Sequence, residues 1–469
     1  MTRRDWILAT GAPLMAQKAA QKKDAAPPPR PNIVFVLADD LAAWMLGCYG
    51  NQEIKTPNID LLARTGTRFS NHFVCTPICS ASRATIFTGR VPRQHGIHDF
   101  LTDRPIEQPP QGQKEIPASF ANEVMLSDIL ANAGYRCGYV GKWHMGPSNA
   151  IGHNYEYSYI MAGQGSSRYQ DPPMYLNGKL VEEKGYLASL MTQRAGEYLE
   201  QQSKDKPFFL TVSYFNPHTP YEGHPQKYYD MYAKSIFDTF GWERAAPNAL
   251  REKQFLADPV ANIRRCAAAT TALDDEVGAL VKKLRERGLA DNTLIVFCGD
   301  NGFLLGRHGL WSKGLASDPI NMYEEAIGVP MIWSWPGKVP PESVRPEVTS
   351  TYDFLPTICD ALDLPVPERN LCGRSYAEIA FGKIHGRPAK YTKEKPWPNL
   401  VFGHFRNTEM ARDNYYKLVL RDGGQGPCEL FDLKKDPRER INQYANPAYT
   451  TVRERLTREL SAWREKHTA

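Results

Sequence analysis

Residues suited to binding a divalent cation occur as two pairs, each of which follows an apolar stretch of the chain. The pairs are Asp39 with Asp40, and Asp300 with Asn301. They come after the runs 33–37 and 294–298, whose continuous apolar character is typical of strands buried on both faces. One acidic pair would indicate a turn or a helix N-cap. Two pairs in matching contexts predict an oxygen-rich site for Ca²⁺ or Mg²⁺ where strand ends line a crevice.

A candidate nucleophile, Cys79, stands at the start of a distinctive string. Residues 79–83 are Cys-Ser-Ala-Ser-Arg, and residues 84–90 continue as Ala-Thr-Ile-Phe-Thr-Gly-Arg. A cysteine taken alone is usually a small buried apolar side chain. We expect a helix to begin near Cys79, so that a bound anion would face free N–H groups and the positive end of the helix dipole. Arg83, one turn further on, is predicted to hold the side chain at position 79 in place.

Four further side chains could bind charged oxygens or transfer protons: Lys142, His144, His218 and Lys313. The first two lie in the segment Gly-Lys-Trp-His-Met-Gly, directly after an apolar pair at 139–140. The third follows the apolar run 208–214, and the fourth ends the segment His-Gly-Leu-Trp-Ser-Lys. Taken singly, such residues are more often solvated or structural than catalytic. A catalytic role is therefore expected only if they occur together with the other motifs.

Together these motifs resemble those of the formylglycine-dependent (type I) sulfatases of the alkaline phosphatase superfamily, over about residues 32–463. In that family the cysteine of a Cys-x-x-x-Arg string, running into Ala-Thr-x-x-Thr-Gly-Arg, is oxidised to formylglycine. The resemblance implies that a maturation enzyme makes formylglycine from Cys79. Proline usually stands two residues after that cysteine, whereas this chain has Ala81. The departure leaves open which maturation enzyme accepts the chain.

The resemblance also implies roles for the remaining residues. The metal ligands would be Asp39, Asp40, Asp300, Asn301 and the modified Cys79, binding Ca²⁺ or alternatively Mg²⁺. Lys142, His218 and Lys313 would stabilise the sulfate oxygens, and the general acid would be His218, either alone or together with Lys313. His144 would deprotonate the second hydroxyl of the hydrated formylglycine, so that sulfate is expelled and the aldehyde re-forms.

The order of predicted elements indicates an α/β fold. Strands at 33–37, 139–140, 208–214, 294–298 and 329–334 alternate with helices beginning at 57, 127 and 258. This alternation predicts a large, mostly parallel or mixed sheet flanked by helices, which the resemblance makes alkaline-phosphatase-like. Strands at 415–420 and 428–433 and an amphipathic helix at 451–465 predict a small C-terminal α+β subdomain. We therefore expect a catalytic domain at 31–385 and the subdomain at 386–469.

The first 30 residues predict an export signal followed by a proline-rich linker. Arg3 and Arg4 precede an apolar stretch at 6–16, as in a twin-arginine signal. The stretch is too short to span a bilayer, and no lipoprotein cysteine follows it. We expect delivery to the periplasm or beyond, without a stable membrane anchor; the alternative is a cytosolic protein with an irregular N-terminus.

Composition narrows the function further. A net charge of +5 over 469 residues is compatible with an anionic substrate and falls far short of a nucleic-acid binder. The nine cysteines show no metal-cluster spacing, and their odd number leaves at least one unpaired or modified. Neither the disulfides nor the oligomeric state follows from the sequence.

The expected substrate is a sulfated small molecule or saccharide, with a saccharide favoured. Segment 150–173 is rich in Gly, Ser, Tyr, Asn and Gln, which suits a sugar pocket as well as an ordinary loop, and Arg168 and Tyr169 are the predicted contacts. Two other functions remain open. One is a phosphodiester or phosphonate monoester hydrolase of the same superfamily. The other is a silent, anion-binding homologue with an unmodified Cys79.

Overall fold

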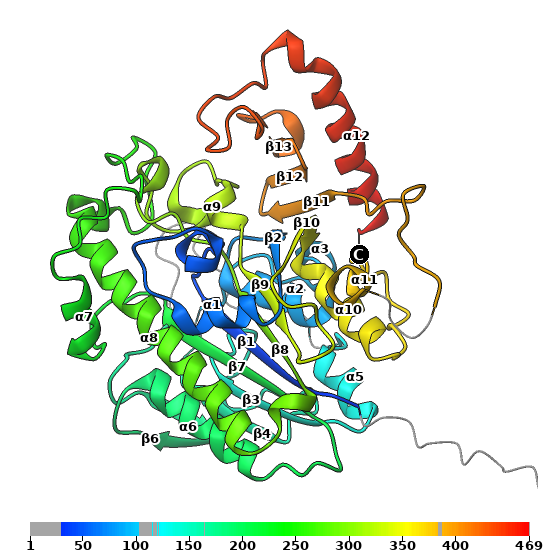
Figure 1. The fold of residues 1–469 in the computed structure, drawn as a ribbon. Coiled ribbons are helices and arrows are strands. Elements are labelled where there is room, and N and C mark those ends of the chain that lie inside the picture. Colours follow the sequence, from blue (N-terminus) through cyan, green and yellow to red (C-terminus); the bar gives the residue numbers. More distant parts are fainter. Residues whose placement is uncertain are drawn as a thin grey trace, which may run out of the picture.

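A ten-stranded sheet forms the centre of the protein (Figure 1). The computed structural model describes residues 30–102, 115, 120, 122–163, 165–382 and 387–468. The twin-arginine signal predicted at 1–30 lies outside these residues except for Arg30, and so does the predicted boundary at 385/386. The strands are β1 (Asn32–Asp39), β2 (Thr67–Phe73), β3 (Arg136–Gly141), β4 (Tyr157–Met161), β5 (Pro173–Leu176), β6 (Lys179–Glu182), β7 (Phe208–Pro217), β8 (Thr293–Gly299), β9 (Met331–Ser334) and β10 (Ser343–Ser350).

The centre of the sheet is parallel and its flanks are mixed. The strand order is β10-β2-β9-β8-β1-β7-β3-β4-β5-β6. β1 pairs in parallel with β7 and β8, and β3 pairs in parallel with β7 and β4. β9 runs antiparallel to both neighbours, and β5 and β6 are antiparallel as well. The prediction of a mostly parallel or mixed sheet is therefore confirmed, and the parallel strands end at one common edge.

Both faces of the sheet are covered, which explains why β1 is apolar between its two end residues. Ile33, Phe35 and Leu37 pack with one set of helices: α2 (Cys79–Thr88), α5 (Leu126–Asn132) and α10 (Phe354–Ala361). Val34 and Val36 face the opposite set: α1 (Pro57–Arg64), α6 (Leu187–Glu200) and α8 (Pro259–Glu286). Figure 1 shows α6 and α8 lying across the sheet. Side chains alternate between the faces of a strand, so a strand buried on both sides has no polar face.

A small antiparallel sheet follows the large one. Its strands are β11 (Leu400–Phe405), β12 (Thr408–Asp413), β13 (Tyr416–Arg421) and β14 (Glu429–Asp432), in that order. Helix α12 (Thr450–Lys466), red in Figure 1, packs on this sheet through Leu456, Leu460 and Trp463. The predicted strands at 415–420 and 428–433 and the helix at 451–465 are confirmed, whereas β11 and β12 were not predicted.

The structure also shows the state of the cysteines and the character of the helices. All nine cysteines lie within the described residues, and each is free. In the part of the chain that the structure describes, no helix combines the length and the apolar character that crossing a membrane requires.

A buried carboxylate of α8 fixes the start of α1, and this contact gives a test of the fold. Asp274 accepts hydrogen bonds from the backbone N–H groups of Asn58 (3.1 Å) and Ile59 (2.8 Å), because Thr56 at the N-cap makes no side-chain cap. We expect Asp274→Ala to lower the free energy of unfolding by about 1–3 kcal/mol, since it leaves buried donors unpaired. Urea unfolding followed by circular dichroism measures this change.

The matched control is the neighbouring carboxylate. The Asp275 side chain is 45% exposed and pairs with Lys227 at the surface. Asp275→Ala should cost about 1 kcal/mol or less, because exposed ion pairs contribute little. Equal losses in the two variants would contradict the assignment of Asp274 as the cap of α1.

Candidate active site

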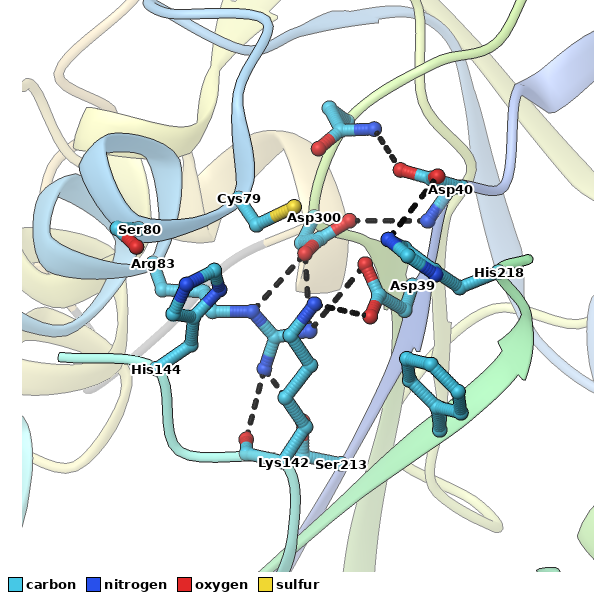
Figure 2. Close-up of polar contacts among 12 residues, drawn as sticks. Asp39, Asp40, Cys79, Ser80, Arg83, Lys142, His144, Ser213, His218 and Asp300 are labelled. Carbon is cyan, nitrogen blue, oxygen red and sulfur yellow. Dashed lines mark hydrogen bonds and ion pairs between the residues drawn. The ribbon is translucent and has the colours of Figure 1, made fainter. Parts of the chain in front are cut away.

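The two predicted oxygen-rich pairs meet at the common edge of the parallel strands (Figure 2). β1 ends at Asp39 with Asp40 next, and β8 ends at Gly299 with Asp300 and Asn301 next. The Asp40 N–H donates to Asp300 Oδ1 at 3.1 Å, and Asn301 Nδ2 donates to Asp40 Oδ1 at 2.7 Å. All four side chains are buried. Residues about 260 positions apart are thus brought together as the sequence predicts.

Cys79 is the first residue of α2, as expected, and it lies deep in the protein. All ten residues of α2 are buried, and Ile78 at the N-cap makes no side-chain cap that would occupy the first amides. Lys313 Nζ donates to Cys79 Sγ at 2.9 Å. Burial alone raises the pKa of a thiol, but Lys142 and Lys313 outweigh it and hold the pKa of Cys79 well below its ordinary value. Burial raises the pKa of Cys75 to about 12, so the two nearby thiols differ sharply.

Arg83 contacts a carboxylate and two neighbouring groups. Its guanidinium lies 2.9 Å from Asp300 Oδ2, and it donates to the Lys142 carbonyl at 2.8 Å and to Ser213 Oγ at 2.6 Å. None of these contacts is with the unmodified Cys79, so the role of Arg83 toward the modified side chain at position 79 stays a prediction. Arg83 lies one helical turn beyond Cys79 and holds the carboxylate layer beneath it, as Figure 2 shows.

Lys142 is placed by the close approach of two strands. Its ammonium donates to Asp39 Oδ2 at 2.6 Å, and its backbone N–H donates to the Ser213 carbonyl at 2.9 Å. Gly141 makes this approach possible, because a Cβ there would lie 2.0 Å from the same carbonyl oxygen and φ is +113°. Lys313 comes from a loop on the other side of the site and pairs with Asp40. Both ammonium groups therefore lie against the predicted metal ligands.

His218 faces the site with one ring nitrogen. Nδ1 donates to the Thr219 carbonyl at 2.5 Å, which turns Nε2 toward Asp40 Oδ2 at 3.7 Å. Burial lowers the pKa of His218, but Asp39 and Asp40 outweigh it and raise the pKa to about 9. The raised pKa of His218 favours the protonated ring, which is the form that a general acid needs.

The predicted saccharide contact at Tyr169 is wrong. The side chain is 1% exposed, and its hydroxyl donates to the His218 carbonyl at 2.8 Å. Tyr169 therefore fixes the turn that carries His218 and cannot stack on a sugar. Arg168 is exposed and donates to the Asp171 carbonyl at 2.7 Å, so its predicted role stays a prediction.

His144 is held by a backbone carbonyl, which defines its tautomer. Nε2 lies 2.9 Å from the Leu101 oxygen, and because a carbonyl only accepts, Nε2 carries the proton. Nδ1 is buried and has no hydrogen-bond partner among the described residues. Burial, followed by Lys142, holds the pKa of His144 well below its ordinary value. The neutral ring thus has a free lone pair on Nδ1, which is what a general base requires.

The oxygen atoms at the strand ends suit a divalent cation. Ligand atoms of four residues lie within 4.8 Å of one another: Asp39, Asp40, Cys79 and His218. Asp39 Oδ1 and Asn301 Oδ1 are buried and accept no hydrogen bond from the described part of the chain. Buried oxygens without donors are costly unless something else binds them. A hard cation that prefers carboxylate and amide oxygens fits this donor set.

A family comparison decides what kind of protein carries this site. Residues 31–364 match the family model described as Sulfatase. The chain belongs to the sulfatase family. It is therefore a sulfuric ester hydrolase with the fold that the sequence predicts. Residues 306–466 of this sulfatase also match the model described as N-sulphoglucosamine sulphohydrolase, C-terminal, so the likeness continues through the small sheet and α12.

Two relatives of this sulfatase carry the name of a saccharide, and others are named arylsulfatases. An ulvan-active sulfatase of Formosa agariphila is 28% identical, and the match covers 95% of this chain and 82% of that protein. The N-acetylglucosamine-6-O-sulfatase of Bacteroides thetaiotaomicron is 26% identical, with coverage of 91% and 85%.

Solved structures share the fold over nearly the whole chain. One complex with its substrate D-glucosamine-2-N,6-O-disulfate has a TM-score of 0.77 at 24% identity and covers 93% of this chain and 98% of that chain. The phosphonate monoester hydrolase of Agrobacterium radiobacter has a TM-score of 0.71 at 22% identity, with coverage of 93% and 96%. The fold alone therefore does not distinguish a sulfate ester from a phosphonate ester.

Three residues that shape the site were not predicted: Ser80, Leu101 and Ser213. Ser213 had a detectable signal, because it is polar within the apolar run of β7. Ser80 Oγ accepts from the Leu101 N–H at 2.9 Å, and the Leu101 carbonyl holds His144. The Leu101 contacts use backbone atoms, so no choice of side chain reveals them.

Removing Arg83 tests its place beneath the site. Arg83→Met leaves Asp300 without its buried partner, so we expect the free energy of unfolding to fall by about 3–5 kcal/mol. Urea unfolding in the presence of a chelator measures this loss. The double variant Arg83→Met/Asp300→Asn should lose less than the sum of the two single variants, because it removes both charges. Strict additivity would sink this account of Arg83.

Proposed function

We propose that this sulfatase hydrolyses sulfate esters of saccharides, using a formylglycine made from Cys79 and a bound divalent cation, with Ca²⁺ preferred. The observation that carries the proposal is the setting of Cys79. Its side chain stands at the start of a buried helix, against Lys313 and beside the carboxylates of Asp39 and Asp40. A nucleophile, an anion cradle and a cation site therefore occupy one small volume.

The proposed reaction has two steps that use different histidines. One hydroxyl of the hydrated aldehyde at position 79 would give its proton to a carboxylate at the strand ends and attack sulfur, while the bond from sulfur to the saccharide oxygen breaks. His218 donates the proton that the leaving alcohol takes up. Nδ1 of His144 then accepts the proton of the second hydroxyl, the bond from carbon to the sulfate oxygen breaks, and sulfate leaves as the aldehyde re-forms. A serine in this position has no second hydroxyl, so its sulfate ester would persist.

The charged oxygens of the sulfate group need a positive cradle. Lys142 and Lys313 would supply it, together with the amides at the start of α2. Asp39, Asp40, Asp300, Asn301 and residue 79 would hold the cation. When bound, the cation lowers the pKa of a coordinated hydroxyl and offsets charge on oxygen.

A saccharide substrate is supported by the relatives, whose names specify ulvan and N-acetylglucosamine-6-O-sulfate. Segment 150–173 gives weaker support, because the buried Tyr169 is no longer available as a contact. A silent homologue is disfavoured, because every side chain that we propose for the reaction is present in the chain. The phosphonate hydrolase alternative shares the fold and is addressed by the substrate comparison below.

The nucleophile is tested by mass spectrometry of active protein. We expect the peptide that contains Cys79 to carry formylglycine when the protein is produced with a suitable maturation enzyme. Cys79→Ala should abolish turnover and keep the unfolding midpoint, whereas Cys79→Ser should accumulate a sulfated enzyme. Full activity with only unmodified cysteine would refute the mechanism.

The cation is tested by metal analysis of purified protein. We expect one Ca²⁺ per chain, and Asp300→Ala should remove most of it because a charged ligand is lost. The control is Asp171→Ala, which removes an exposed carboxylate whose side chain is 45% exposed. Chelation should abolish turnover, and added Ca²⁺ should restore it. Unchanged metal content in Asp300→Ala would show that the ligand set is wrong.

The substrate class is tested by comparing kcat/KM across esters. The panel contains sulfated mono- and oligosaccharides, 4-nitrophenyl sulfate, choline sulfate, a phosphate diester and a phosphonate monoester. We expect a sulfated saccharide to give the highest value. A higher value for the phosphonate or the diester would favour the alternative hydrolase, and inert saccharides would end the carbohydrate proposal.

A further inference from the structure

An arginine at the rim of the site holds its charge over an aromatic ring and leaves its hydrogen bonds unused. The guanidinium carbon of Arg251 lies 4.4 Å from the ring centroid of Phe100, and both side chains are half-buried. Within the described part of the chain, no residue forms a hydrogen bond or an ion pair with Arg251. A guanidinium has five N–H donors, so the stacking fixes its plane without using them.

The segment that carries Arg251 is tied to two sides of the active site. The Leu250 N–H donates to the Ala316 carbonyl at 2.7 Å, three residues beyond the catalytic-loop lysine Lys313. Glu252 accepts from Thr219 Oγ1 at 3.0 Å, next to His218. Glu252 also has φ of +56°, an unusual value for this residue type, so the segment is held in a specific conformation.

Phe100 connects to the opposite side. The next residue, Leu101, donates to Ser80 Oγ beside Cys79, and its carbonyl holds His144. The pair Arg251–Phe100 therefore spans from the His218 segment to the His144 segment. A substrate whose sulfate lies at Cys79 must leave its alcohol portion near segments that border these histidines.

One neighbouring carboxylate, that of Asp99, attracts Arg251 but forms its ion pair with another arginine. Asp99 lies close, since Arg251 is among the groups that oppose the effect of burial on the pKa of Asp99. Its carboxylate is already taken by Arg406, whose Nε donates to Asp99 Oδ2 at 2.7 Å. Arg406 lies in the turn between β11 and β12, so the small sheet contributes to this rim.

We propose that Arg251 binds a second anionic group of the saccharide, a carboxylate or a further sulfate, and thereby determines specificity on the leaving-group side of the ester. This inference rests on the proposed saccharide sulfatase function. A planar guanidinium matches the paired oxygens of either group. The stacked, half-buried position favours such recognition, because little side-chain freedom is left to lose on binding.

Arg251→Gln tests the proposal by a change in specificity. Four substrates are compared: 4-nitrophenyl sulfate, N-acetylglucosamine 6-sulfate, glucosamine-2-N,6-O-disulfate, and a 6-sulfated disaccharide that carries a uronic acid. The value of kcat/KM for a saccharide with two anionic groups, relative to the aryl sulfate, should fall at least about tenfold through KM. The disulfate and the uronate distinguish which anion is bound. Arg251→Lys keeps the positive charge but loses the planar guanidinium. Its relative kcat/KM should therefore lie between the values of the wild type and of Arg251→Gln.

The matched control removes a charge two residues away. Lys253 is exposed, and Lys253→Gln should leave the specificity ratio unchanged. The proposal would be overturned if Arg251→Gln left the ratio of kcat/KM between the doubly anionic saccharides and the aryl sulfate unchanged, whether or not kcat/KM itself fell. Calorimetry with glucosamine-2-N,6-O-disulfate and with the uronate disaccharide, in the Cys79→Ala background, measures Kd without turnover. Equal Kd values with and without Arg251 refute the rim site, whereas a wild-type enzyme inert on saccharides refutes the proposed function.

Discussion

The site depends on a balance of buried charge between three carboxylates and three basic groups. The carboxylates are those of Asp39, Asp40 and Asp300, and the basic groups are those of Arg83, Lys142 and Lys313. An unpaired charge at this depth costs several kcal/mol, so each member requires the others. They come from β1, β8, α2, the end of β3 and a distant loop. The sheet order and the burial of α2 are thus conditions for the charges to meet.

The same balance suits the chemistry. Three negative and three positive side chains leave the site close to neutral before any cation binds. A divalent cation would then give the site a net positive charge, which favours an anionic ester and the negative charge that develops on its oxygens. Neutral pairing inside the protein thus permits a strongly positive pocket for the substrate.

The sequence predicts the parts of the site that depend on residue type at a strand end. Buried strands have a plain apolar signal, so Asp39 and Asp300 could be placed at one edge before the fold was known. Contacts made by long side chains or by backbone atoms could not be predicted from the sequence. Arg83 reaches the carboxylates rather than position 79, and Leu101 contributes only a carbonyl. The prediction that Tyr169 in segment 150–173 contacts a sugar was wrong, because a tyrosine suits a buried core as well as a sugar-binding surface. The run 329–334 has the same apolar signal whichever way the strand runs, so the antiparallel direction of β9 was not predictable.

The burial of Cys79 sets an order of events in the life of the chain. The residue is 3% exposed, and the whole of α2 around it is enclosed by the sheet and by neighbouring helices. A second enzyme could not bind this segment as an extended peptide once the segment is buried in the folded protein. The oxidation of the thiol that we propose would therefore have to precede folding, in the compartment where the chain is made. A copy that folds first would be well packed and stable, and it would keep the unmodified cysteine.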